Sequence, residues 1–409
     1  MFMYRPLCNS SKAANVALSA DAKIRDKPIK IALVAGEVSG DNLGAGLMQA
    51  LLKKTQNIEF VGIAGPKMQA LGCRSLYSMD ELIVMGILVS LVSIGRILWI
   101  RNRLYRYLVK NPPDVFVGID APDFNLGLEA RLRKKGITCI HYVSPTVWAW
   151  RRYRLKKIKR AVDHMLAILP FEEAFYKEYN IPVTYVGHPM AEEIELHPDV
   201  QAARKRLGLP EDRVIVALLP GSRRSELERH GHLFVDTVRW IHERNRKLQF
   251  VVAPVDISTQ KQFENAITEQ QGKNLPIEII TGKSREVMTA CDLVVLASGT
   301  AALEAALLKK PMVVTYRVSF LTYIIVKLLS HVKYYSMPNN LAGRELVPEL
   351  MQYDATAENI GRAVEKILSD PEEKNHLVEE LEKMHLDLKR DGDQRAAETV
   401  LSYIKGDPA

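Results

Sequence analysis

Two short turns in this sequence combine small residues with a charged side chain, and together they could bind a nucleoside diphosphate. Each turn follows an apolar run, and their residues are Gly221, Ser222, Arg223, Ser298, Gly299 and Thr300. A turn that opens a helix presents unpaired N–H groups to phosphate, and arginine can bind a diphosphate through two parallel hydrogen bonds. Glu304, about one turn into the second helix, could accept both hydroxyls of a ribose. The alternative is two ordinary capped helix starts, because the helix dipole also favours a carboxylate there.

A third apolar run, residues 115–119, is followed by two carboxylates that could act as a general base. Asp120 and Asp123 stand three residues apart, and Asn125 comes next. A general base has to lie within hydrogen-bond reach of the hydroxyl whose proton it removes, and a carboxylate at the end of a strand can be placed in that way. Both carboxylates are therefore candidates for a general base. Capping of the next helix is the competing role, and it suits Asp123 or Asn125 better.

A glycine-rich loop follows the first apolar run, residues 29–35, and carries further polar side chains. This loop contributes Glu37, Ser39 and Asp41. Its glycines do not have the GxGxxG spacing of dinucleotide-binding proteins, and the GK[ST] ending of a Walker A loop is missing. An NAD-dependent oxidoreductase is therefore disfavoured. The loop predicts close approach of a substrate to the backbone, although tight packing of a helix on a strand explains its glycines about as well.

Parallel sheets have to position these loops, and the apolar pattern predicts two of them. Short runs rich in β-branched residues alternate with helical spacing, which is typical of a doubly wound α/β fold. The expected strands are residues 29–35, 60–63, 115–119, 138–143, 165–169 and 184–187, followed by 214–219, 249–253, 277–280, 293–296 and 312–315. Open sheets bind ligands at the carboxyl ends of their strands, so two Rossmann-like halves predict an active site in a cleft between domains.

The length of the chain, 409 residues, exceeds one ordinary domain, and its 47% hydrophobic and 25% charged residues are typical of globular proteins. We expect a poorly ordered N-terminal extension at 1–28, a first α/β domain at 29–190, a linker at 191–212, a second α/β domain at 213–385 and a C-terminal helical segment at 386–409. The four cysteines are scattered without a CxxC pair. Neither a disulfide framework nor a structural zinc site is therefore predicted.

An apolar stretch, residues 82–100, interrupts the α/β pattern. It carries a single charge, Arg96, and is long enough to cross a bilayer. Because it lies inside an α/β series that must stay on one side of a membrane, we consider two other interpretations. One is a buried helix, and the other is an exposed apolar surface that rests on a bilayer or holds acyl chains. The residues expected at such a surface are Met85, Leu88, Val89 and Trp99. A second apolar piece lies at 320–332.

The net charge of +8 is concentrated in one part of the chain. Residues 96–160 hold 16 Lys and Arg against 4 Asp and Glu, which is a local net charge of +12. This block directly follows the apolar stretch, and basic residues beside an apolar surface are typical of elements that bind anionic membranes. RNA binding is the alternative for residues 151–160, but no nucleic-acid-binding module accompanies them.

Seven segments, taken together and in order, resemble the lipid-A-disaccharide synthase family. They are AGEVSGDNLGAGL (35–47), FVGIAGPKM (60–68), PDVFVGIDAPDFN (113–125), HYVSPTVWAW (141–150), LLPGSRRSE (218–226), LASGTAALE (296–304) and PNNLAGRELVPEL (338–350). Their combination is specific where each segment alone is not, and nothing carries over to residues 1–28. The resemblance implies an α/β fold of GT-B type, in which two Rossmann-like doubly wound domains face each other across a cleft. C-terminal helices often return to the first domain in this fold.

The resemblance also implies a reaction. An inverting, metal-independent transfer moves 2,3-diacylglucosamine from its UDP derivative to 2,3-diacylglucosamine 1-phosphate, and the products are UDP and a β-1,6-linked disaccharide 1-phosphate, the lipid A precursor. It implies no cofactor and no nucleic acid. Such enzymes are cytoplasmic and peripheral at the inner face of the cytoplasmic membrane of Gram-negative bacteria. An anionic phospholipid surface is thus an expected partner. Formation of a homodimer is possible and is left undecided by the sequence.

Within that reaction the resemblance gives the residues roles. Asp120 would take the proton of the acceptor hydroxyl, and Arg223 would neutralise the departing UDP. The residues expected to bind the donor are Gly221, Ser222, Ser298, Gly299, Thr300, Glu304, Asn339 and Glu345, and those expected to bind the acceptor are Glu37, Ser39, Asp41, Asp123 and Asn125. The nearest rival is another GT-B enzyme acting on a UDP-amino sugar, such as a polyprenyl-linked glycosyltransferase or a 2-epimerase. An epimerase would need no apolar membrane surface.

Overall fold

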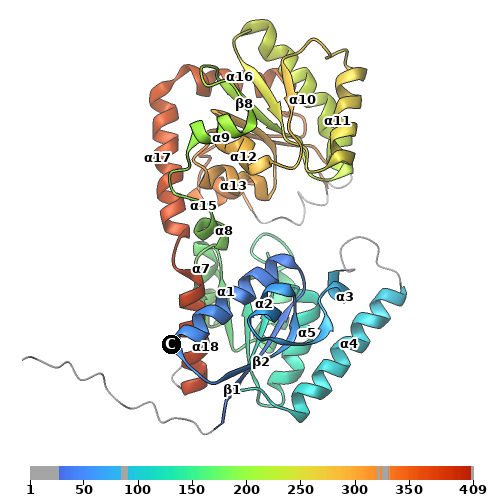
Figure 1. The fold of residues 1–409 in the computed structure, drawn as a ribbon, viewed down its shortest axis with the longest axis vertical. Coiled ribbons are helices and arrows are strands. Elements are labelled where there is room, and N and C mark those ends of the chain that lie inside the picture. The colour runs from blue at the N-terminus through green and yellow to red at the C-terminus, as the bar shows by residue number, and fades with distance from the viewer. Residues whose placement is uncertain (1–26, 84–90, 320–322, 325–329, 331, 407–409) are drawn as a thin grey trace, which may run out of the picture.

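Two α/β domains make up the fold in this computed structural model, which describes residues 27–83, 91–319, 323–324, 330 and 332–406. Figure 1 shows them one above the other, with helices of the C-terminal part running along one side of both. Each domain is built on one sheet whose paired strands are all parallel. The predicted α/β fold class is therefore confirmed.

The first sheet has the strand order β3-β2-β1-β4-β5-β6-β7. Its strands are β1 (Ile29–Ala35), β2 (Ile58–Ala64), β3 (Arg74–Ser78), β4 (Val115–Ile119), β5 (Thr138–Tyr142), β6 (His164–Ala167) and β7 (Val183–Tyr185). The helices between them are α1 (Val38–Lys54), α2 (Pro66–Ala70), α3 (Asp80–Ile83), α4 (Leu91–Lys110), α5 (Pro122–Arg133), the short 3₁₀ turn η2 (Arg152–Arg154), α6 (Leu155–Ala161) and α7 (Pro170–Glu178). All five residues of β4 are buried, as expected for a central parallel strand covered on both faces.

The second sheet has the order β10-β9-β8-β11-β12-β13. Its strands are β8 (Ile215–Leu219), β9 (Gln249–Val252), β10 (Ile277–Ile279), β11 (Leu293–Ala297), β12 (Met312–Tyr316) and β13 (Glu349–Met351). The helices of this half are α8 (Pro189–Glu193), α9 (Val200–Leu207), α10 (Arg224–Arg244), α11 (Ile257–Glu269), α12 (Ser284–Ala290), α13 (Thr300–Leu307), α15 (Met337–Ala342), α16 (Ala357–Ser369), α17 (Pro371–Leu388) and α18 (Gly392–Lys405).

The last two helices pack on different domains. His385 of α17 is completely buried, and its two ring nitrogens lie 3.0 Å from the carbonyl of Leu307 on α13 and 2.9 Å from that of Ala191 on α8. The next helix, α18, packs along α1 instead. Its side chains that join the first core are Ala396, Ala397, Val400, Leu401 and Ile404. The chain therefore returns to the first domain after completing the second (Figure 1).

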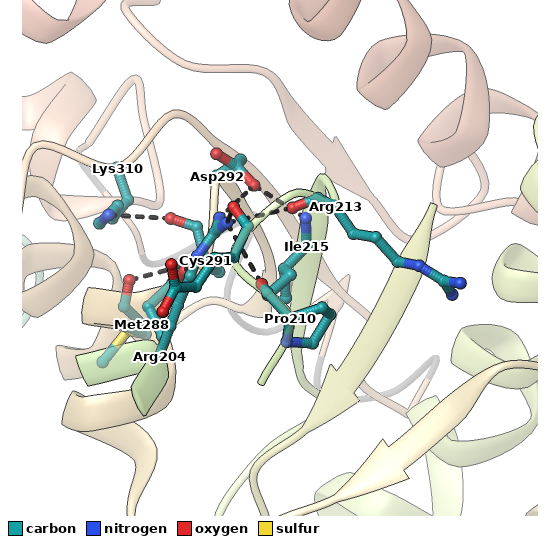
Figure 2. A network of polar contacts seen from close by, with 10 residues as sticks. Arg204, Pro210, Arg213, Ile215, Met288, Cys291, Asp292 and Lys310 are labelled. Atoms are coloured by element: carbon teal, nitrogen blue, oxygen red, sulfur yellow. Dashed lines mark hydrogen bonds and ion pairs between the residues drawn. The ribbon is translucent and has the colours of Figure 1, made fainter. Parts of the chain in front are cut away.

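The segment between the sheets is fixed to the second domain by one buried arginine. Arg204 of α9 places its guanidinium 2.8 Å from Asp292 Oδ2, and the same carboxylate oxygen accepts the Ile215 N–H at 2.8 Å (Figure 2). The other groups that accept hydrogen bonds from this guanidinium are the carbonyls of Pro210, Glu211, Arg213 and Ala290. Because the cation is paired and its donors are used, its burial is tolerated.

Several expectations about the apolar stretch fall outside the described residues. Met85, Leu88 and Val89 do so, and so does most of the second apolar piece at 320–332. In the described part, α4 is amphipathic: Ile97, Ile100, Leu104 and Leu108 are buried, while Ile94, Leu98 and Trp99 are about two-fifths exposed. Among the residues that the structure describes, no helix combines the length and the apolar character needed to cross a bilayer.

Candidate active site

The strand order reverses once in each sheet, and the predicted loops follow the strands at that point. In the first sheet β1 pairs with β2 on one side and with β4 on the other, so the loops after β1 and β4 flank the reversal. In the second sheet β8 and β11 have the same relation. Ligands of open α/β sheets bind outside the carboxyl ends of the strands at such a reversal. The loops identified in the sequence therefore occupy the two places where this fold binds ligands.

The loops after β1 and β4 touch each other. A Cβ atom added to Gly36 would lie 2.6 Å from the Cβ of Ala121, which is closer than two carbon atoms can approach. The absence of a side chain at Gly36 therefore lets the two loops meet. Glu37, the next residue, lies within hydrogen-bond reach of the Asp120 carboxyl group. Two acidic side chains from different loops thus share this edge of the first sheet.

The backbone around Asp120 is held in an uncommon conformation. Asp120 has a φ of 49°, in the left-handed region, and its N–H donates to the Tyr142 carbonyl at 2.8 Å. Burial raises the pKa of the Asp120 carboxyl group, and the charge of Glu37 raises it further, whereas His141 lowers it. A carboxylate with a raised pKa is a stronger base than an ordinary surface aspartate. Burial and the neighbouring Glu37 therefore make the Asp120 carboxylate more basic than that of an ordinary surface aspartate.

The polar residues of the first loop differ in their access to solvent. Glu37 and Ser39 are exposed, and the Ser39 hydroxyl donates to Glu37 Oε1 at 2.5 Å. Asp41 is only 3% exposed, and its two oxygens accept the N–H groups of Lys67 and Met68 at 2.9 and 3.1 Å. Asp41 therefore holds the start of α2, and the acceptor-binding role predicted for it does not fit the structure.

The two acceptor candidates after Asp120 are also unlike each other. Asp123 is exposed and forms an ion pair with Arg154 at 3.1 Å. Asn125 is completely buried, and its Nδ2 donates to the carbonyl of Asp120 at 2.8 Å and to those of Ile119 and Val34 at 3.3 and 3.4 Å. A side chain in this position cannot touch the acceptor. Asn125 instead joins the ends of β1 and β4, and this corrects the sequence prediction.

The turn after β8 is occupied by a side chain of its own helix. Glu226 Oε2 accepts the N–H groups of Ser222 and Arg223 at 2.9 and 3.2 Å. Gly221 has a φ of 131°, and a Cβ there would lie 2.5 Å from the Cβ of Glu226. The Arg223 side chain is exposed. The sequence predicted free N–H groups for phosphate at this turn, but in the structure a carboxylate already binds them.

The turn after β11 is more open. Gly299 and Thr300 are exposed, and a Cβ at Gly299 would have no neighbouring atom within 4 Å. Ser298 is anchored, because its hydroxyl donates to the Tyr335 carbonyl at 3.1 Å. Glu304 accepts a hydrogen bond from Arg285 Nε at 2.5 Å through Oε1. One of the two Glu304 carboxylate oxygens is therefore already in contact with Arg285.

The two donor-binding residues expected from the PNNLAGRE segment differ in their exposure to solvent. Glu345 is exposed, whereas Asn339 is completely buried. The groups that bind the Asn339 amide are the Val347 carbonyl, Glu349 Oε1 and the N–H groups of Leu346 and Val347, at 2.7 to 2.8 Å. All four of its hydrogen bonds are thus internal, so the predicted contact of Asn339 with the donor does not fit. Glu349 was not identified from the sequence.

The first domain has an exposed face on α4 with an aromatic ring and arginines, and a basic groove between the neighbouring helices α5 and α6. On α4, the exposed Trp99 packs its ring edge-on against Tyr77 and under the guanidinium groups of Arg96 and Arg103. Helix α5 packs against both α4 and α6. A groove of about 720 Å³ between α5 and α6 is lined by basic residues, which are Arg133, Lys134, Lys156, Lys157, Lys159 and Arg160. Six cations of the basic block therefore line a groove between α5 and α6, while others belong to α4 itself.

The fold and the two loop pairs define the class of protein. Solved structures with the same fold include a glycosyltransferase from Rickettsia africae, with a TM-score of 0.58 and 13% identity over 93% of this chain and 99% of that one. A UDP-GlcNAc 2-epimerase from Neisseria meningitidis bound to UDP-GlcNAc has a TM-score of 0.56 and 12% identity over 93% of this chain and all of that one. The chain thus has the two-domain α/β fold of GT-B type.

Sequence relatives narrow this class. A family model described as lipid-A-disaccharide synthetase matches residues 31–403. Proteins named lipid-A-disaccharide synthase are 48% identical in Erwinia tasmaniensis and 44% identical in Methylobacillus flagellatus, each over 92% of this chain and 99% of the relative. This chain belongs to the lipid-A-disaccharide synthase family and is a glycosyltransferase. The resemblance noted in the sequence is thereby confirmed.

Proposed function

We propose that this enzyme condenses UDP-2,3-diacylglucosamine with 2,3-diacylglucosamine 1-phosphate, giving UDP and the β-1,6-linked lipid A disaccharide 1-phosphate. One observation carries the proposal: Asp120, with a raised pKa, stands at the strand reversal of the first sheet in a chain of this family. The acceptor would bind beside Glu37 and Asp120 on the first domain. The donor would bind at the turns after β8 and β11, in a cleft between the domains.

Asp120 then acts on the acceptor. Its carboxylate takes the proton of the 6-hydroxyl while that oxygen forms a bond to the anomeric carbon of the donor. The bond from this carbon to the UDP oxygen breaks on the opposite face, so the configuration inverts. The leaving UDP gains negative charge, which the exposed Arg223 and the N-terminal ends of α10 and α13 can stabilise.

Donor binding requires two internal contacts to change. The diphosphate would replace Glu226 Oε2 at the N–H groups of Ser222 and Arg223, since both are anionic acceptors for the same donors. The ribose would replace Arg285 at Glu304 Oε1. Both displaced groups are charged, so each can turn toward solvent when the nucleotide arrives.

A direct assay tests this function. The full-length protein is incubated with UDP-2,3-diacylglucosamine and 2,3-diacylglucosamine 1-phosphate, and UDP release is followed together with the mass of the lipid product. We expect equal amounts of UDP and disaccharide 1-phosphate, and no UDP without the acceptor. A protein that forms no disaccharide, but converts a UDP-amino sugar into its 2-epimer, would instead be the rival enzyme.

Metal chelation gives a second expected result. In the described part of the chain, no three His, Cys, Asp or Glu side chains gather as they would around a metal ion. Because Arg223 and two helix N-termini supply positive charge for the leaving group, EDTA is expected to leave the rate of UDP release unchanged. Loss of activity with EDTA and its recovery with Mg²⁺ would contradict this mechanism.

We also propose that the protein works on the inner face of the cytoplasmic membrane, with α4 and the neighbouring basic groove on anionic phospholipid. Both proposed substrates carry acyl chains, and α4 exposes Ile94, Leu98 and Trp99 beside arginines. Apolar side chains flanked by cations are the usual features of an interfacial helix.

Leu98→Asp is therefore expected to lower the partition onto phosphatidylglycerol vesicles by roughly 10- to 100-fold, because a buried leucine contributes about 1.5–3 kcal/mol. Vesicle pelleting measures this effect. Leu386→Asp is the matched control, since Leu386 is 51% exposed on α17. Figure 1 shows α17 on the opposite side of the molecule from α4. Equal binding by wild-type and Leu98→Asp would show that α4 does not contact the membrane.

A further inference from the structure

A half-buried carboxylate at the edge of the second sheet receives four hydrogen bonds. Glu349, the first residue of β13, accepts the Tyr335 N–H at 2.9 Å through Oε2. Its Oε1 accepts the N–H and the hydroxyl of Ser336 at 2.8 and 2.5 Å, and the Asn339 Nδ2 at 2.8 Å. Hydrogen bonds to an ionised group are stronger than those between neutral groups, so this carboxylate fixes the segment that leads into α15.

Two polar partners in this network are completely buried. Ser336 and Asn339 are both 0% exposed, and the Asn339 amide oxygen accepts the N–H groups of Leu346 and Val347 at 2.7 and 2.8 Å. The chain on both sides of α15 is thus tied to Glu349, either directly or through Asn339. A buried polar network whose members are hydrogen-bonded in this way holds the backbone around it in one arrangement.

Tyr335 connects this network to the turn after β11. Its N–H is bound by Glu349, and its carbonyl accepts the Ser298 hydroxyl at 3.1 Å. Among the three residues of that turn, all of which the structure describes, only Ser298 forms a hydrogen bond through its side chain. The Tyr335 carbonyl thus anchors the turn through Ser298, in addition to the backbone bond from the Ser298 N–H to the Thr315 carbonyl at 3.0 Å.

We infer that Glu349 is a positioning residue for the donor: its carboxylate holds Tyr335, and the Tyr335 carbonyl in turn fixes Ser298 at the turn that receives the UDP moiety. The inference rests on the proposed function, which places the donor at the turns after β8 and β11. Donor groups bind an anion more tightly when their direction is fixed before the ligand arrives, because less order has to be gained on binding. Glu349 therefore contributes to donor affinity without touching the donor.

Glu349→Gln tests this inference, because an amide has one oxygen where the carboxylate has two. Placed at the position of Oε1, this oxygen keeps three of the four hydrogen bonds, and the NH₂ group then faces the Tyr335 N–H. Two donors cannot bond to each other, so Tyr335 is released. The dissociation constant of UDP, measured by titration calorimetry on the full-length protein, is expected to rise by roughly tenfold, as when a hydrogen bond to a charged group is lost. The KM for the acceptor is expected to stay unchanged.

Further variants locate the effect and control for stability. Ser298→Ala removes the other end of the connection and is also expected to weaken UDP binding. Because both changes act through one contact, the double variant is expected to bind UDP no more weakly than the weaker of the two single variants, whereas independent effects would multiply. If Glu349→Gln does not fold, Glu349→Asp carries the test, since it keeps the charge but is one methylene shorter. Asp370→Asn is the control: the exposed Asp370 accepts the Glu373 N–H at 2.9 Å at the start of α17, and its loss is expected to leave UDP binding unchanged.

The outcomes separate this inference from the proposed function. An unchanged UDP dissociation constant in Glu349→Gln overturns the inference, even if the variant unfolds at a lower urea concentration, because Glu349 would then be structural. Wild-type UDP binding by Ser298→Ala, or effects that multiply in the double variant, overturn it as well. If the variants bind UDP as expected but the wild-type protein forms no disaccharide, the proposed function fails and the role of Glu349 in UDP binding stands. A wild-type protein that does not bind UDP contradicts both.

Discussion

Asp120→Asn is expected to lower kcat/KM for UDP release by roughly 10² to 10⁴-fold, the usual contribution of a positioned general base. The amide has nearly the shape of the carboxyl group and can keep its neighbours, but it cannot accept the hydroxyl proton. The backbone contacts of this residue, to Tyr142 and Asn125, do not involve the side chain, so the fold is expected to persist. Initial rates at saturating and limiting acceptor separate kcat from KM.

Asp114→Asn is the matched control for this prediction. Asp114 stands at the other end of β4, where its Oδ2 accepts the Lys30 N–H at 2.8 Å. A loss of this contact changes stability but not the base, so the rate is expected to stay close to wild type. Near-normal turnover by Asp120→Asn would remove the assignment, and Glu37 would be the carboxylate to examine next.

Arg204→Met is expected to lower the free energy of unfolding by about 1–3 kcal/mol, since it removes the donors that satisfy several buried carbonyls and leaves the half-buried Asp292 carboxylate without its cation. The Arg204 side chain is 5% exposed, and Figure 2 shows its guanidinium between Asp292 and the carbonyls of the interdomain segment. The methionine fills similar volume but donates no hydrogen bond. Urea unfolding, followed by circular dichroism, measures the loss.

Arg213→Met controls for the removal of charge alone. Arg213 is exposed, and the Arg204 network uses only its carbonyl, so a change within about 0.5 kcal/mol is expected. If Arg204→Met unfolds at the same urea concentration as this control, the buried network does not stabilise the second domain.

The central strands could be predicted from the sequence, while two edge strands could not. Strands β4, β8 and β11 are completely buried and appear in the sequence as short uninterrupted apolar runs. The missed strands, β3 and β13, lie at the edges of the two sheets and contain only exposed or half-buried residues. A half-buried segment of three to five residues lacks the continuous apolar run that distinguishes a central strand.

The loops of the site were predictable for the same reason, because they follow the central strands. The contacts that each side chain makes within these loops could not be predicted. Asp41 and Asn125 are polar residues in the right loops, yet their partners are backbone groups of other segments, such as the N–H of Lys67. Likewise, nothing in the sequence places Glu129 against His141, since that contact depends on how α5 packs on β5. Local patterns do not contain such tertiary partners.

The position of α18 has a consequence for how the protein is made. The hydrophobic core of the first domain includes Ala396, Val400 and Leu401, which are translated after the whole second domain. Domains usually fold one after another as the ribosome releases them. Here the first domain stays incomplete until α18 has emerged, and the exposed side of α1 has to wait for it. The domain that is translated first is therefore the last to complete its hydrophobic core. A ribosome stalled while translating the second domain would carry a first domain that still lacks α18.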